Sequence, residues 1–160
     1  MTNTFAISVS VDNVHAQDDG SYTGDFTFEQ TAGSPTIVDR KGNFDLKDVS
    51  GETDITFDWA SPTVEINGQE YPASYFFGDQ TGNNILISEG KDSNPRVSGK
   101  HPPMSGTDEF LVDEAPSAGA FMLVDKNNDK KKYAYCMMAY INIDGGRVLV
   151  DDPKIYNKPS

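Results

Sequence analysis

The chain lacks the sequence features of cross-linked, exported and membrane-spanning proteins. Its 160 residues include a single cysteine, Cys136, so no disulfide can form within it. No stretch approaches the roughly 20 apolar residues that a membrane span requires. The first residues, MTNTFAISVSVD, have neither the basic segment nor the long apolar core of a secretory signal. We therefore expect a cytoplasmic protein with no membrane partner.

Positive charge is scarce as well. The chain holds 13 lysines and arginines against 25 aspartates and glutamates, which gives a formal net charge of −12. Proteins that bind nucleic acid through its phosphates need a basic surface, so nucleic acid is not an expected partner. The simpler interpretation of the excess charge is a well-solvated acidic surface. The alternative is an acidic mimic that blocks a basic protein partner.

Helical periodicity is also missing. No segment of ten or more residues repeats its apolar positions with the 3.6-residue period of a helix. Apolar and polar residues instead alternate over Phe5–Val11 and again over Ile55–Trp59, which predicts half-buried strands. Asn67-Gly68 is typical of a tight hairpin turn, and the polar stretch Asn13–Gly24 predicts a loop.

These patterns predict an all-β protein. Short strands separated by turn signals indicate a two-sheet Greek-key β-sandwich of about eight or nine strands. We expect one domain over 1–160, because a chain of this length buries roughly two-thirds of its unfolded surface in one core. A long loop is predicted near 89–108, where Gly, Pro, Ser and Asn recur.

The longest apolar run belongs to the last hairpin, Lys132–Pro153, with the sequence KYAYCMMAYINIDGGRVLVDDP. Alternate residues of its first strand fall on opposite faces. Tyr133 and Tyr135 lie on one face, and Cys136 and Met138 on the other. Both sets are apolar, so this strand is predicted to be central and covered on both sides.

The order of a Tyr-rich strand, a short turn and an Asp-Pro-x-Ile-x-Asn ending resembles the C-terminal end of many small bacterial β-sandwich proteins. The positions that carry it are Tyr133, Tyr135, Gly145, Asp152, Pro153, Ile155 and Asn157. A looser similarity runs to the bacterial inclusion-body (AidA/PixA) family. The resemblance implies a cupredoxin-like or immunoglobulin-like architecture and, by analogy of fold alone, an inclusion-body-like role.

Two metal sites can be tested against the sequence. A blue-copper site needs two imidazoles, a thiolate and a thioether, but no histidine follows Cys136 as the cupredoxin order requires. Asp125, Asn127 and Asp129 match the first alternate oxygen ligands of a calcium loop. That match then stops, because the required glycine and glutamate are replaced by Lys130 and Cys136. We expect a polar turn there, no bound metal and no cofactor.

Catalytic motifs are absent, so we expect a protein that is not an enzyme. No nucleophile elbow and no glycine-rich phosphate loop occurs. A set of aromatic and polar residues, Trp59, Tyr75, Asp79 and Asn83, could instead form a sugar-binding platform. Core packing explains its rings equally well.

The favoured function is therefore a non-enzymatic binding or self-association module, inclusion-body-like by resemblance. Its expected partner is protein, either a second copy of the chain or another protein. A carbohydrate-binding, lectin-like module is the alternative, and the acidic mimic is a further one.

Overall fold

The computed structural model describes residues 3–75, 84–90, 110–112, 119–127, 132–144, 146–151 and 154–156. Within these ranges the protein contains twelve β-strands and no α-helix, so the prediction of an all-β fold is confirmed. The strands are β1 (Asn3–Ala16), β2 (Tyr22–Ala32), β3 (Phe44–Asp45), β4 (Thr53–Trp59), β5 (Thr63–Ile66), β6 (Gln69–Ser74), β7 (Ile85–Glu89), β8 (Phe110–Val112), β9 (Ala120–Asp125), β10 (Lys132–Ile141), β11 (Arg147–Asp151) and β12 (Lys154–Tyr156).

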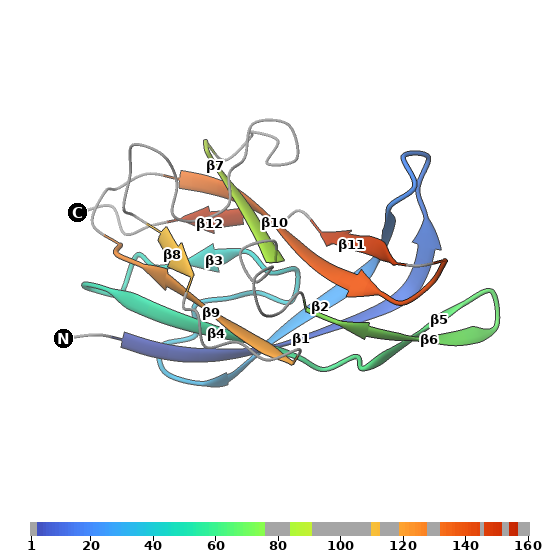
Figure 1. Cartoon of the computed structure of the whole chain (residues 1–160). Coiled ribbons are helices and arrows are strands. Elements are labelled where there is room, and N and C mark those ends of the chain that lie inside the picture. Colours follow the sequence, from blue (N-terminus) through green and yellow to red (C-terminus); the bar gives the residue numbers. More distant parts are fainter. Residues whose placement is uncertain are drawn as a thin grey trace.

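The strands form two facing layers (Figure 1). The first layer has the order β2-β1-β4-β9-β8. The second is built on β10, which pairs with β7 and β6 along one edge and with β12 and β11 along the other. The layers meet where Leu149 of β11 lies beside Tyr22 of β2, and the Thr23 hydroxyl donates to the Val150 carbonyl at 2.8 Å.

One connection crosses between the layers. After β2 the chain enters the second layer as β3, which pairs with β12, and then returns to the first layer as β4. This crossing makes β4 a parallel neighbour of β1, with Phe5 beside Ile55 and Val9 beside Trp59. A succession of simple hairpins could not give this parallel pairing.

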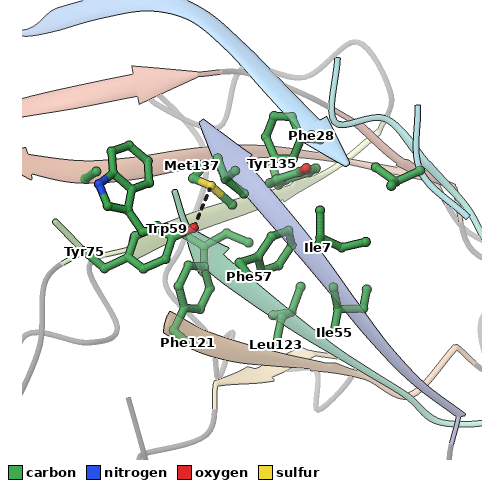
Figure 2. Packing of buried hydrophobic residues seen from close by; sticks show 14 of the residues in the cluster. Ile7, Phe28, Ile55, Phe57, Trp59, Tyr75, Phe121, Leu123, Tyr135 and Met137 are labelled. Carbon is green, nitrogen blue, oxygen red and sulfur yellow. Dashed lines mark hydrogen bonds between the residues drawn. The ribbon is translucent and has the colours of Figure 1, made fainter. Parts of the chain in front are cut away.

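The core fills the space between the layers, and Figure 2 shows its centre. Alternate residues of each strand point inward because the side-chain period of a strand is two. The burial pattern of β1 and β4 follows the predicted alternation. Buried inward residues come mainly from four strands: Phe5, Ile7, Val9 and Val11 of β1; Ile55, Phe57 and Trp59 of β4; Phe121 and Leu123 of β9; and Tyr133, Tyr135, Met137, Ala139 and Ile141 of β10.

β10 is the central strand of the second layer, as its apolar sequence predicts. Five successive residues, Tyr133–Met137, are at most 3% exposed. Burial on both faces along this half of the strand explains why its sequence does not alternate between apolar and polar.

Two predicted loops differ from the structure. Asn13–Gly24 is not a loop throughout, because β1 continues to Ala16 and β2 begins at Tyr22. A β-bulge between Asp12 and His15, with Asn13 at a φ of +54°, accommodates polar residues that suggested a loop within the strand pair. The loop predicted near 89–108 begins later than expected, since Glu89 ends β7, and its residues from 91 onward lie outside the described part.

No helix in the described residues is long and apolar enough to cross a membrane.

Candidate functional site

The predicted sugar platform does not present its rings to solvent. Trp59 is 9% exposed and Tyr75 is fully buried. Their ring centroids are 5.2 Å apart, and Tyr75 meets Phe121 edge-on at 4.8 Å, so both rings belong to the core (Figure 2). A ring must offer an open face to stack on a sugar, so Trp59 and Tyr75 do not form the predicted platform. Asp79 and Asn83 lie outside the described residues.

The Tyr75 hydroxyl is equally unsuited to chemistry with a ligand. It donates to the Met137 Sδ at 3.8 Å, deep in the core. Burial, together with the nearby charge of Asp58, holds the pKa of Tyr75 well above its ordinary value. The phenol therefore stays protonated and serves packing.

The predicted cation turn is a structural turn over its described residues. Asp125 is fully buried and Asn127 is 6% exposed. The Asn127 N–H donates to Asp125 Oδ1 at 2.8 Å, and the Asn127 side-chain amide donates to the Val49 carbonyl at 2.9 Å. These bonds tie the end of β9 to the segment that precedes β4. Asp129 lies outside the described residues.

The side chains that the structure describes form no cluster of metal ligands. No group of three or more His, Cys, Asp or Glu residues there could hold a metal ion. His15 is exposed, and its Nδ1 lies 2.8 Å from the carbonyl of Asn13, two residues away.

The outer face of the second layer is the strongest candidate for a functional surface. Residues opposite one another in a sheet share a face. The register pairs Leu86 of β7 with Cys136, and Val150 and Val148 of β11 with Met138 and Tyr140. Leu86, Met138 and Val148 are half-buried rather than buried, so apolar side chains of three adjacent strands reach solvent together.

This outer face contains an open hollow of about 440 Å³. We call it the outer-face hollow and define it by its lining residues: Asp19, Gly20, Ser21, Leu86, Met138, Gly146, Arg147, Val148 and Val150. Its floor is apolar and comes from β7, β10 and β11. Its rim comes from the turn before β2 and from the turn before β11.

The two rim turns are held in place by short-range bonds. In the first, Asp19 Oδ1 accepts from the Ser21 N–H at 2.9 Å, and the Gln17 N–H donates to the Ser21 carbonyl at 2.8 Å. In the second, Gly146 adopts a φ of +118° beneath the Tyr140 ring. A Cβ at Gly146 would lie 2.7 Å from the Tyr140 ring, so only glycine fits there without a shift.

A second hollow lies between β1 and the β5–β6 hairpin. It measures about 590 Å³ and is lined by Val11, Asp12, Asn13, Val14, Thr63, Val64, Glu65 and Glu70. We call it the acidic groove, because its charged lining residues are all carboxylates. Glu65 and Glu70 lie directly opposite each other across the hairpin.

Sequence patterns revealed only part of the outer-face hollow. The apolar second face of β10 indicated a surface that needs a cover, and this pointed to Met138. The rim residues Asp19 and Ser21 gave no such signal. They lie more than 100 residues from the floor strands β10 and β11, and only the parallel contact between β2 and β11 brings them there.

Comparison with known proteins gives a likeness of structure alone. No protein-family model matches the chain, and no curated protein matches it. Among solved structures, the inclusion body protein PixA of Burkholderia cenocepacia is similar at 11% sequence identity and a TM-score of 0.39. The match covers 96% of this chain and 95% of that chain. That protein belongs to the inclusion-body family that the last hairpin also resembles, but a likeness at this level establishes no function for this chain.

Proposed function

We propose that the chain is a non-enzymatic module that associates with copies of itself through the outer-face hollow. One observation carries the proposal: Leu86, Met138 and Val148 reach solvent side by side on an otherwise well-formed layer. Contiguous apolar surface of this kind commonly marks a protein interface. Covering this apolar surface favours association, against the cost of lost translational, rotational and side-chain freedom.

An inclusion-body-like role, which the resemblance of the last hairpin implies, is one form of such self-association. We also retain the cytoplasm as the proposed location. The single cysteine, Cys136, is fully buried and forms no disulfide, which suits a reducing compartment.

The two alternatives fare differently. The described rings of the sugar platform lie in the core, so nothing on the described surface favours a carbohydrate. The acidic mimic is favoured by the acidic groove, whose three carboxylates suit a basic partner. The two functions use different surfaces, so substitutions separate them: a change in the outer-face hollow affects self-association, and a change at Glu65 affects only a basic partner.

Sedimentation velocity over a wide range of protein concentration tests the proposal. We expect wild-type multimers that grow with concentration, and a monomer for Val148→Asp, because the new carboxylate would be buried unpaired in the interface. The matched control is Thr56→Asp, which places the same charge at a half-buried strand position of the first layer. Thermal melts followed by circular dichroism verify that both variants fold.

Two results would count against the proposal. A wild-type protein that stays monomeric at the highest attainable concentration contradicts self-association. A folded Val148→Asp variant that associates as well as wild type contradicts the use of the outer-face hollow.

A further inference from the structure

The free edge of β2 is a separate feature that the proposed function does not use. On one side β2 pairs with β1 along most of its length. On the other side its only ladder partner in the described residues is β11, at Tyr22. Further along this edge, the Phe28 N–H donates to the Arg40 carbonyl at 2.9 Å. Between these two contacts, residues 24–27 pair on this edge with no strand of the described part of the chain.

The direction of the Phe26 backbone follows from its neighbours. Phe26 lies opposite Val11, and the Val11 N–H donates to Ser61 Oγ at 3.0 Å, away from β2. Val11 and Phe26 are therefore a non-hydrogen-bonded pair, and the Phe26 N–H and carbonyl point to the free edge. The Phe28 N–H, two residues further along β2, donates to Arg40 on this same edge, as the two-residue alternation of a strand requires. In the described part of the chain, neither backbone group of Phe26 has a partner.

A second unpaired donor lies close to this edge. Trp59 is 9% exposed, yet its indole Nε1–H has no hydrogen-bond acceptor among the described residues. Its ring centroid lies 6.5 Å from that of Phe26, which is half-buried. Figure 2 shows the indole nitrogen on the side of the ring that faces away from Phe57 and the core centre. The Nε1 atom itself is shielded from solvent, so Trp59 packs on the core side of Phe26 and reports on this edge without contacting a partner.

The charges around the edge select the kind of segment that fits. Asp25 and Glu29 are exposed on β2, and Asp12 lies directly opposite Asp25. A second copy of β2 would bring its own Asp25 and Glu29 beside these carboxylates, which disfavours pairing between copies. A basic segment would be attracted to them.

We propose that the free edge of β2 binds a basic, extended segment of a partner protein, which adds as a strand beside residues 24–27. The main chain of the segment pairs with the Phe26 N–H and carbonyl, in the manner of β-strand addition. One of its apolar side chains covers the half-buried Phe26 ring. Its lysines or arginines lie over Asp25 and Glu29.

Synthetic peptides test this inference with the intact chain. The probe is an end-blocked peptide of alternating lysine and valine, and its matched control alternates glutamate and valine. Trp59 is the single tryptophan, so its emission reports binding directly. We expect the basic peptide to shift the emission and to protect the Phe26 amide from hydrogen exchange, and the acidic peptide to do neither.

Two variants separate strand addition from simple charge attraction. Phe26→Pro removes the outward N–H at an edge position, where proline is tolerated, and should weaken basic-peptide binding at least about tenfold. Phe26→Leu keeps the N–H and should bind within about threefold of wild type. A thermal melt verifies that each variant folds. If the Phe26→Pro variant does not fold, protection of residues 24–27 from hydrogen exchange in the peptide-bound Phe26→Leu variant takes its place as the test.

The inference is overturned by three results. They are no binding of the basic peptide, binding without protection of residues 24–27, or equal binding of both peptides. None of these outcomes tests self-association through the outer-face hollow, because the two surfaces share no residue.

Discussion

At the scale of single residues, two buried tyrosines of the core carry very different hydrogen bonds. Tyr75 and Tyr135 are both fully buried. The Tyr135 hydroxyl donates to the Gly42 carbonyl at 2.6 Å and so ties the turn before β3 to the central strand β10. The Tyr75 hydroxyl donates only to the Met137 thioether, a poor acceptor, at 3.8 Å.

Removing each hydroxyl should therefore have unequal effects on stability. Tyr135→Phe leaves the buried Gly42 carbonyl without this donor and should lower the free energy of unfolding by about 1–3 kcal/mol. Tyr75→Phe breaks a bond of little strength and should change it by less than about 0.5 kcal/mol. Urea denaturation of the two variants beside wild type measures both values. Equal losses would mean that the Tyr135 bond contributes nothing beyond packing.

The same residues show why a site is harder to predict than a strand. The alternation around Trp59 correctly predicted β4 and its inward face. The sequence does not show which layer covers that face. Its pattern also does not distinguish an aromatic ring packed in a core from one exposed on a sugar-binding platform. For Trp59 and Tyr75 the answer depends on Phe121 and Met137, which lie 46 or more residues away in the chain.

At the scale of elements, the turn that joins β2 to β3 is organised by one carboxylate. Asp39 Oδ1 accepts from the N–H groups of Lys41 and Asn43, each at 2.9 Å, and Oδ2 accepts from the Asn43 amide at 3.0 Å. Partial burial alone would raise the pKa of Asp39. The hydrogen bonds from Asn43 and Lys41, with the Lys41 charge, outweigh it and hold the pKa below 3.8.

This depressed pKa predicts how the turn responds to acid. Because the carboxylate is favoured in the folded state, its contribution is complete above about pH 4 and is lost as pH falls through the lower folded pKa. Asp39→Asn should therefore be less stable than wild type at neutral pH, and the difference should shrink below about pH 4. Urea denaturation at several pH values measures it. A difference that stays constant down to pH 2 would exclude titration of Asp39 as its source.

Elements built from local signals were predictable, and elements built from distant pairing were not. Asn67 and Gly68 form the expected hairpin turn, with positive φ at both residues. β3 and β12 are two and three residues long, and both depend on distant partners: they pair with each other, and β12 also pairs with β10. The bulge at Asn13 likewise depends on its partner β2. Such elements carry no periodicity of their own, so a single sequence cannot reveal them.

At the scale of the whole molecule, the net charge of −12 opposes the self-association that we propose. The outer-face hollow is locally balanced, since its lining includes one acidic and one basic residue, Asp19 and Arg147. Added salt screens repulsion between two acidic molecules but leaves apolar contact intact. Moderate sodium chloride should therefore increase the multimer fraction in sedimentation velocity. A multimer that dissociates as salt is added would indicate an interface held by charge pairs instead.

The place of β10 in the chain has a consequence for synthesis. β10 fills the centre of the second layer, yet it begins only at Lys132. On the ribosome β1, β2 and β4 emerge much earlier, with the apolar faces of Phe5 and Phe57 still uncovered. The core can close only after most of the chain has been translated, so the nascent protein passes through a long interval in which it can aggregate or be held by chaperones.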